Sequence, residues 1–340
     1  MRPTTKDLAR EAGVSLATVD RVLNERPGVT AETVRRVNEA IDKLGFVRNA
    51  SAAILARRRP YRFLFVLPRT GDQFLGEVIA RISEANAAFA SEMVVAEVVQ
   101  IDTLDPHLLA KYLTGLDPAE VDGVAIMAPE SPPVRDAVLR LPERGIEGLA
   151  FITGQPGTPA GDFVGIDNHA AGATAGRLMG RFAGGAEGGI LVVADTMHAR
   201  DSIERRQGFD EVITRDFPRL TALPSLETYG DHARARQIIG NAMQSRQPVV
   251  GFYVLGSEAR VALAAAAEVA APRPQIVIVH ERTPFTEDGL RKGDIDAVIA
   301  QNPGHLVRSA IRTLRAKAGQ SMLLASQEKI RIEIVLLENL

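Results

Sequence analysis

The chain has 340 residues, 46% of them hydrophobic and 24% charged, and is long enough for two or three compact globular units. It contains no cysteine and no His-Glu-x-x-His pair, which excludes disulfides, cysteine zinc fingers and thiol nucleophiles. The net charge of −2 is divided unevenly, because residues 1–59 hold 12 Lys or Arg and 7 Asp or Glu, whereas the rest holds 28 and 35. A basic head on an acidic body favours nucleic acid as a partner at one end only.

Three helices are expected in the basic head, residues 1–47, because apolar residues recur there at helical spacing. Capping residues and glycines mark where these helices begin and end, namely Thr4 with Asp7, Gly13, Ser15, Thr30 and Gly45. The first two helices, residues 4–24, have the size of a helix-turn-helix, in which the second helix enters the major groove of DNA.

The second helix is expected to have one apolar face and one exposed face. Its apolar positions are Val19, Val22 and Leu23, and its outward positions are Leu16, Ala17, Asp20 and Arg21. An arginine at this place can form a bidentate contact with guanine. An ordinary three-helix bundle with a surface arginine has the same spacing, so the pattern by itself leaves both interpretations open.

After residue 60 the pattern changes to short apolar runs that alternate with helical stretches. The runs are Phe63–Leu67, Val94–Ile101, Val121–Met127, Gly148–Ile152, Phe163–Ile166, Ile190–Val193, Val249–Leu255, Ile276–Val279 and Ala297–Ala300. Helices are expected between several of them, at Glu77–Phe89, Ala170–Phe182 and Glu258–Val269. Continuous apolar strands that alternate with helices predict an α/β fold with parallel sheets covered on both faces.

The predicted organisation has three parts: an all-α helix-turn-helix headpiece at 1–47, a hinge helix or linker at 48–60, and a two-lobed α/β domain at 61–340. The body is too long for one doubly wound sheet of usual size. We expect its first lobe at about 61–160 and 302–320 and its second at about 161–300 and 321–340. The last segment, 330–340, is predicted to be a terminal strand.

The head closely resembles the headpiece of the lactose/galactose repressor family over about 55 residues without a gap. The similar stretches are 4–24 (TTKDLAREAGVSLATVDRVLN), 29–33 (VTAET), 41–46 (IDKLGF) and 49–56 (NASAAILA). The resemblance implies a sequence-specific transcriptional regulator, expected to be a repressor.

The resemblance also implies DNA contacts at nine positions, which are Thr4, Ser15, Leu16, Ala17, Thr18, Arg21, Asn24, Asn49 and Leu55. Leu16, Ala17 and Arg21 match positions that read bases in the major groove. Ser15 and Thr18 match positions that hold phosphates, and Asn24 resembles an asparagine that contacts the DNA backbone. Leu55 matches a leucine of the hinge helix that is inserted into the minor groove, with plain apolar packing as the alternative.

The head departs from the family pattern at several positions. Asp20 stands where many relatives have serine, and its carboxylate would repel a phosphate. Arg48 stands where proline is common, and Leu16 and Ala17 offer only apolar contacts, so the operator is expected to differ from those of relatives with polar residues there. Because one headpiece covers few base pairs, we expect a homodimer on a palindromic operator.

The body resembles the two-lobed sugar-binding proteins of the periplasm, of the type I fold. The similar segments are Phe63–Pro68, Val164–Asn168, Arg205–Phe209, His280–Pro284 and Ile295–Pro303. The resemblance implies a small effector of the sugar or polyol class, and ligands of α/β folds bind at the carboxyl ends of strands, here between the lobes.

Six residues are candidates for effector binding: Asp72, Phe74, Arg205, Glu258, Glu281 and Gln301. Arg205 is the foremost, because regulators of this family place a ligand-binding arginine four residues before an aromatic. Simple packing is the alternative for Phe74, and solvation is the alternative for Glu258 and Glu281. The segment Ser257–Arg260 differs from the Gly-Asn-Arg of relatives, so a regulator that senses a metabolite other than a sugar is an alternative interpretation.

Two other classes of function are weighed against this interpretation. A solute-binding protein of a transport system would lack the basic head and would carry a signal peptide, which is not recognisable here. An enzyme would need a nucleophile elbow, a P-loop or a metal cluster, and none is recognisable. Asp195, His198 and Asp201 are close in sequence but are interpreted as solvated loop residues. We therefore expect a cytoplasmic protein with no enzymatic activity, no cofactor or metal and no membrane partner.

Overall fold

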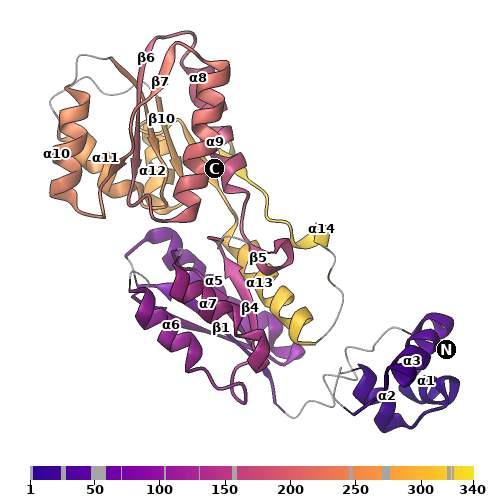
Figure 1. The fold of residues 1–340 in the computed structure, drawn as a ribbon. Coiled ribbons are helices and arrows are strands. Elements are labelled where there is room, and N and C mark those ends of the chain that lie inside the picture. Colours follow the sequence, from indigo (N-terminus) through magenta and orange to yellow (C-terminus); the bar gives the residue numbers. More distant parts are fainter. Residues whose placement is uncertain are drawn as a thin grey trace. The chain divides into compact units, whose positions relative to one another are not determined.

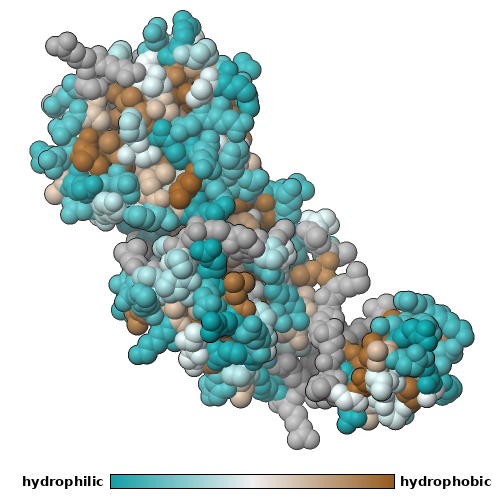
Figure 2. Space-filling view, viewed as in Figure 1, coloured by the Kyte–Doolittle hydropathy of each residue, from teal (hydrophilic) through white to brown (hydrophobic). Residues whose placement is uncertain are grey.

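The computed structural model describes residues 3–23, 28–46, 59–69, 71–102, 105–129, 131–154, 159–244, 248–269, 276–319, 323 and 325–340. The chain divides into two compact units, Met1–Arg58 and Arg59–Leu340, and each is described on its own (Figure 1). Within the described ranges, no helix has both the length and the apolar character that crossing a membrane requires. The visible surface is largely hydrophilic, with apolar side chains scattered over it (Figure 2).

The first unit contains three helices: α1 (Thr5–Ala12), α2 (Leu16–Leu23) and α3 (Ala31–Leu44). The predicted caps are confirmed, because Thr4 forms a capping box with Asp7 and Thr30 caps α3. Gly13 and Gly45 end α1 and α3 in left-handed conformations with φ of 63° and 58°, which cost little only for glycine.

The three helices enclose a small apolar core of their own. Leu8, Val19 and Val37, one from each helix, are completely buried in it. The helical periodicity of the sequence predicted these inward positions, since residues three or four apart lie on one face of a helix.

The first lobe of the second unit is built on a parallel sheet with the strand order β2-β1-β3-β4-β5. Its strands are β1 (Tyr61–Pro68), β2 (Val94–Ile101), β3 (Gly123–Ile126), β4 (Glu147–Phe151) and β5 (Phe163–Val164). Its helices are α5 (Gln73–Phe89), α6 (Pro106–Thr114), α7 (Pro132–Leu139) and α13 (Pro303–Ala318), with 3-10 turns η1 (Ala90–Glu92), η2 (Pro142–Arg144) and η3 (Ala160–Asp162). Helices α5 and α13 pack together, as do α6 and α7, and each pair shares an apolar cluster with the sheet.

The second lobe contains a larger sheet with the order β12-β11-β10-β9-β6-β7, in which β8 also pairs with β6. Its strands are β6 (Gly188–Ala194), β7 (Leu220–Ala222), β8 (Leu226–Glu227), β9 (Val249–Val254), β10 (Ile276–His280), β11 (Ala297–Ala300) and β12 (Glu333–Val335). The remaining helices and turns are α8 (Asn168–Phe182), α9 (Arg200–Asp216), α10 (His232–Met243), α11 (Ala259–Ala267), α12 (Pro284–Lys292), α14 (Ala325–Glu328) and η4 (Leu337–Asn339). All its pairings are parallel except that of β11 with β12.

Three predicted boundaries differ from the structure. β5 pairs with β4, so the first lobe extends beyond residue 160 to at least Val164. α14 packs against α13, and Ser309 Oγ donates to Glu328 Oε2 at 2.5 Å, so the chain returns to the second lobe later than residue 321. The terminal strand predicted at 330–340 is only β12, because a 3-10 turn follows it.

The sequence prediction missed β7 and β8. These strands have three and two residues, which is too short for any alternation of apolar and polar residues to be visible. They exist because β6, a fully buried strand, offers backbone groups to both: Gly188 pairs with Leu220 and Val193 with Leu226.

Candidate functional site

The outward face of α2 is open to solvent within its own three-helix unit. Leu16 is 46% exposed, and Ala17, Asp20 and Arg21 are exposed as well, whereas Val19 on the opposite face is buried. This arrangement agrees with the two faces predicted from the sequence. It presents two small or apolar side chains and one guanidinium at the start and middle of the helix, a set that can contact base edges.

Hydroxyl groups surround the amino-terminal ends of the first two helices. Ser15 Oγ accepts a hydrogen bond from the Thr18 backbone N at 3.1 Å and lies 2.8 Å from Thr18 Oγ1. Thr4 accepts from the backbone N of Asp7 at 3.3 Å in its capping box. A helix amino terminus carries a partial positive charge and free N–H groups, so these positions are suited to a phosphate.

An arginine of α3, which the sequence analysis did not single out, fixes the turn between α1 and α2. Arg36 Nη2 donates to the backbone oxygen of Ala12 at 2.5 Å and to that of Gly13 at 3.2 Å. These bonds satisfy carbonyl groups at the end of α1 and set the direction in which α2 leaves the turn. The contact joins residues more than twenty positions apart, and no local pattern could have indicated it.

Three of the nine predicted DNA contacts, Asn24, Asn49 and Leu55, lie outside the described residues, as does Arg48. Their assigned roles stay predictions.

In the second lobe, three of the predicted effector residues lie together at the carboxyl edge of the parallel sheet. Arg205, Glu281 and Gln301 are 1%, 1% and 2% exposed. Arg205 Nη2 donates to Glu281 Oε1 at 3.3 Å, and Gln301 Nε2 donates to the same oxygen at 2.9 Å. Glu281 follows β10 and Gln301 follows β11, so the parallel pairing of these strands brings the two side chains side by side.

The guanidinium of Arg205 is held on all of its nitrogens. Besides the bond to Glu281, Nε donates to Asn168 Oδ1 at 2.9 Å and Nη1 donates to the backbone oxygen of Leu255 at 2.8 Å. A buried cation needs such compensation, because an unpaired charge inside a protein is strongly disfavoured. Arg205 therefore ties α9 to α8 and to the residues that follow β9 and β10.

Glu281 combines a strained backbone with a buried carboxyl group. Its φ is 65°, which is unusual for a residue other than glycine and typical of functional sites. Burial raises its pKa to about 7, because the loss of hydration outweighs the attraction of Arg205 and the hydrogen bonds from Gln301. The Oε1 atom of Gln301, on the amide that contacts this carboxyl, is buried without a hydrogen-bond partner in the described structure.

Asp72 lies where the two lobes touch. It caps α5, with Oδ1 accepting from the Phe74 backbone N at 2.7 Å, and the hydroxyl of Ser257 in the second lobe donates to its Oδ2. Burial, the largest influence, raises the pKa of Asp72. Two further hydrogen bonds cross between the lobes here, one from Arg260 Nη2 to Gly71 O at 2.8 Å and one from Phe285 N to Gln73 Oε1 at 3.3 Å.

Two predicted effector residues, Glu258 and Phe74, make contacts other than those that join Arg205, Glu281 and Gln301. Glu258 caps α11 and binds Arg260, accepting from its backbone N at 3.0 Å and its Nε at 2.8 Å. Phe74 is 2% exposed and belongs to the apolar core of the first lobe, as the packing alternative anticipated. The structure thus groups Arg205, Glu281 and Gln301 by direct contact and does not bring Glu258 or Phe74 into that contact group.

Asp195 is the residue at this edge that the sequence analysis judged wrongly. It follows β6, is half-buried, and accepts a hydrogen bond from Thr228 Oγ1 at 3.1 Å, so it is not a freely solvated loop residue. Burial, and then the repulsion of Glu258, Asp72 and Asp201, raise its pKa to about 6. Across the described residues, no three His, Cys, Asp or Glu side chains are grouped so as to hold a metal ion.

We predict that Asp195→Asn stabilises the protein at neutral pH but not at pH 4. The ordinary pKa of an aspartate side chain is 3.8 and that of Asp195 in the fold is about 6, so its contribution to stability is present below 3.8 and is lost as the pH rises through 6. The amide oxygen can still accept from Thr228. Chemical denaturation should give a gain of about 1–2 kcal/mol at pH 7, after allowance for partial exposure. A variant less stable than the parent at pH 7 would contradict this.

Glycines bring α8 and α9 into close contact and thereby place Arg205. A Cβ added to Gly172 of α8 would lie 1.8 Å from the backbone oxygen of Arg205, and one added to Gly208 of α9 would lie 2.0 Å from that of His169. Only glycine permits backbones to approach so closely. Gly208 is the glycine of the segment Arg205–Phe209 that resembles the sugar-binding proteins. The close contact between α8 and α9 explains why a glycine is needed at this position.

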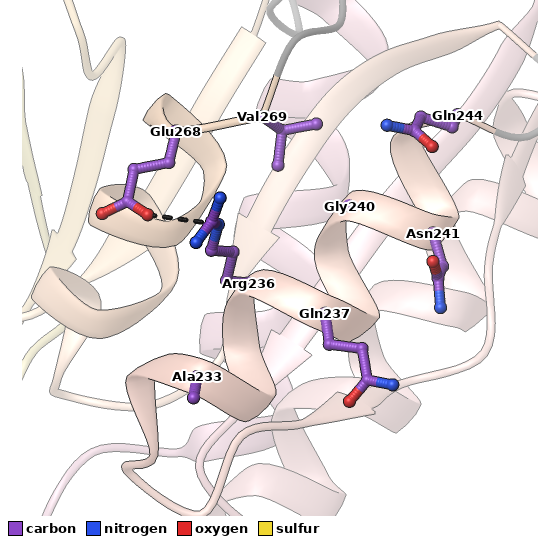
Figure 3. A pocket seen from close by; sticks show the side chains of 8 residues that line it. All are labelled: Ala233, Arg236, Gln237, Gly240, Asn241, Gln244, Glu268 and Val269. Carbon is purple, nitrogen blue, oxygen red and sulfur yellow. Dashed lines mark ion pairs between the residues drawn. The ribbon is translucent and has the colours of Figure 1, made fainter.

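A surface concavity of about 520 Å³ lies on a different part of the second lobe, between α10 and α11 (Figure 3). It is lined by Ala233, Arg236, Gln237, Gly240, Asn241, Gln244, Glu268 and Val269. Arg236 Nε and Glu268 Oε2 form an ion pair across it at 3.4 Å (Figure 3). None of the six predicted effector residues lines it.

Comparison with known proteins agrees with this two-part architecture. Residues 4–49 match the family of bacterial regulatory proteins of the lacI type, and residues 63–321 match the periplasmic binding protein domain. The chain is 34% identical over 141 residues to the HTH-type transcriptional regulator RegA of Clostridium saccharobutylicum (42% of this chain, 40% of that protein). It is 32% identical over 128 residues to catabolite control protein A of Priestia megaterium (38% and 37%). The chain thus spans about two fifths of the length of the curated relatives it matches.

Solved structures share the fold of the body. One is a solute-binding protein of an ABC transporter from Burkholderia graminis in complex with D-arabinose, with a TM-score of 0.70 at 20% identity over 83% of this chain and 98% of that one. Another is a LacI transcriptional regulator, described as putative, from Bacteroides fragilis, with a TM-score of 0.68 at 17% identity over 83% and 98%. The chain therefore belongs to the family of the periplasmic binding protein domain over residues 63–321, and this domain follows a helix-turn-helix at residues 4–49 that matches the lacI type of bacterial regulatory proteins.

Proposed function

We propose that this protein is a transcriptional repressor that binds a palindromic operator as a homodimer and responds to a small sugar, polyol or sugar derivative. The observation that carries the proposal is the open face of α2, where Leu16, Ala17 and Arg21 are exposed. The match of residues 4–49 to the lacI type of bacterial regulatory proteins supports a DNA-binding role for that face. We propose DNA contacts for Thr4, Ser15, Leu16, Ala17, Thr18, Arg21, Asn24, Asn49 and Leu55.

The effector is proposed to bind where the lobes meet, at Asp72, Arg205, Glu281 and Gln301. Three hydrogen bonds cross between the lobes beside this group, so a ligand there would compete with them or reinforce them. Such a ligand would shift the population between two lobe arrangements. A coupling of about 1–3 kcal/mol between effector and operator is typical of this type of control.

Selection from random duplexes tests the DNA-binding proposal. The full chain should enrich an inverted repeat, and footprinting should protect two equivalent half-sites one helical turn or a multiple apart. A single asymmetric half-site would count against the dimer, and the absence of any enriched sequence would overturn the regulatory function.

The selected operator permits a prediction for one side chain. We predict that Arg21→Ala weakens operator binding by about 1–3 kcal/mol and relaxes the preference at one base pair in each half-site. Arg10→Ala is the matched control, because Arg10 is an exposed arginine on α1 with 81% of its side chain accessible. Arg10→Ala should reduce affinity, if at all, equally for operator and random DNA. Full discrimination by the Arg21 variant would remove Arg21 from the residues that contact bases.

Transport and catalysis are the competing functions. The helix-turn-helix argues against a transport protein, although solved transport proteins share the fold of the body. The relatives named above are regulators, which supports the proposal that this protein has no enzymatic activity. A regulator that binds DNA is expected to act in the cytoplasm. A turnover assay on any ligand found by thermal shift separates a binding protein from an enzyme.

A further inference from the structure

The hydrogen-bond donors around the proposed effector site are largely occupied by protein acceptors. Each of the three nitrogens of Arg205 donates to a protein oxygen, and Gln301 Nε2 donates to Glu281. The hydroxyls of Ser257 and Thr228 donate to Asp72 and Asp195. A ligand arriving here therefore finds few free donors.

Acceptors, in contrast, are in excess at the same place. Gln301 Oε1 is buried and has no hydrogen-bond partner within the described structure, although its own amide nitrogen contacts the Glu281 carboxyl. A buried acceptor without a donor is costly and is uncommon in folded proteins. It calls for a donor that the described part of the chain does not supply.

The charges at this edge are also unbalanced. Arg205 is paired with Glu281, and Arg260 is paired with Glu258. Asp195 has no ion-pair partner among the described residues, and the carboxylates of Asp72, Asp201 and Glu258 are close enough to repel it. The Oδ2 atom of Asp195 lies close to Gly256, because a Cβ added to that glycine would be 3.4 Å from it. The next residue, Ser257, donates a hydrogen bond to Asp72. Carboxyl groups from both lobes, Asp195 and Asp72, therefore lie next to the loop at Gly256 and Ser257.

We propose that the effector carries a primary ammonium group that is held between the lobes by the carboxylates of Asp195 and Asp72, with Gln301 Oε1 accepting a further hydrogen bond from the ligand. The proposal rests on the proposed function and names the chemical class of its effector: a small amino sugar or amino polyol. An ammonium group supplies three donors and a positive charge, which match the unpartnered acceptor Gln301 Oε1 and the carboxylate of Asp195. A metal ion would need several protein ligands, and no three such groups are assembled among the described residues.

Binding of matched amine and neutral sugars to the full-length chain tests the proposal. The probes are D-glucosamine, D-galactosamine and D-mannosamine, each compared with its N-acetyl form and with the parent hexose, at pH 7.5. Thermal shift and calorimetry should find an amino sugar that binds at least about 10-fold more tightly than both neutral counterparts, the size of effect expected for a charge-assisted hydrogen bond. Asp195→Asn should remove that preference. Asp136→Asn is the control, because Asp136 is an exposed acid on α7, and it should change nothing.

Three results would overturn the proposal: a neutral counterpart that binds as tightly as its amine, no binding by any of the amines, or an amine preference that survives in Asp195→Asn. Failure of the proposed function gives different results. If a neutral sugar binds and alters operator affinity, the regulatory function is supported and the proposal of a cationic effector is wrong. If an amino sugar binds but the chain prefers no DNA sequence, the proposed ligand class is supported and the proposed regulatory function is wrong.

Discussion

Replacing Arg205 with alanine is expected to lower the free energy of unfolding of the body by about 3–5 kcal/mol. The guanidinium is 1% exposed and joins Asn168, Leu255 and Glu281, which belong to three different parts of the second lobe. Its removal takes one donor and the balancing charge from the buried Glu281 carboxyl and removes the donor that Arg205 gives to the Asn168 and Leu255 oxygens. Urea denaturation of the variant and the parent measures the loss.

The Arg205→Ala result has two controls. Arg215→Ala on the same helix removes an exposed guanidinium that pairs with Asp216, and we expect no measurable change in the free energy of unfolding. A double-mutant cycle with Glu281→Ala should give a coupling of more than about 1 kcal/mol, because the two groups are in contact and shielded from water. A loss of less than about 1 kcal/mol for Arg205→Ala, or additive effects in the cycle, would show that the buried pair does not hold the lobe together.

A role of Arg205 in effector binding needs a variant that keeps the fold. Alanine at this position would remove the proposed ligand contact and destabilise the fold at the same time. Arg205→Lys keeps the charge but loses the planar fork, so it should retain more stability while weakening the effector response.

Gly172→Ala is expected to destabilise the body by about 3 kcal/mol or more. The new methyl carbon would lie 1.8 Å from the backbone oxygen of Arg205, so α8 and α9 would have to move apart. That movement would also pull Arg205 from Asn168, and effector binding should be lost together with stability. Thermal unfolding and ligand titration of the same sample measure both effects.

Gly76→Ala is the matched control for this prediction. Gly76 lies inside α5, and a Cβ there would have no heavy atom within 4 Å. The same substitution should therefore raise stability by about 0.5–1 kcal/mol, because alanine favours the helix. Equal effects of the two alanines would mean that the close contact between α8 and α9 has no energetic importance.

Local features of the fold could be predicted where a single residue determines the backbone. The caps at Thr4 and Thr30 and the left-handed glycines at positions 13 and 45 each depend on neighbours within four positions, so the sequence revealed them. The buried strands were visible as apolar runs for the same reason. The short strands β7 and β8 depend on backbone pairing with distant segments, and no local pattern indicated them.

The candidate site was predictable in part. The rule that ligands bind at carboxyl ends of strands placed Glu281 and Gln301 at one edge, and the resemblance to a family singled out Arg205. Asp195 was misjudged because it was interpreted together with His198 and Asp201 as part of a loop, while its burial comes from Thr228 and the loop after β9, more than thirty positions away. Asn168 was missed because its contact with Arg205 depends on the crossing of α8 and α9.

The most direct measurement of the central claim is a titration of the full-length protein with two labelled duplexes, the selected operator and a scrambled version, by fluorescence anisotropy at about 150 mM salt. A moderate salt concentration suppresses the phosphate contacts that any basic head would make. The account predicts that the operator binds at least about 1,000-fold more tightly than the scrambled duplex and that a ligand found by thermal shift changes only the operator affinity. Equal affinities for the two duplexes, with and without that ligand, would contradict it.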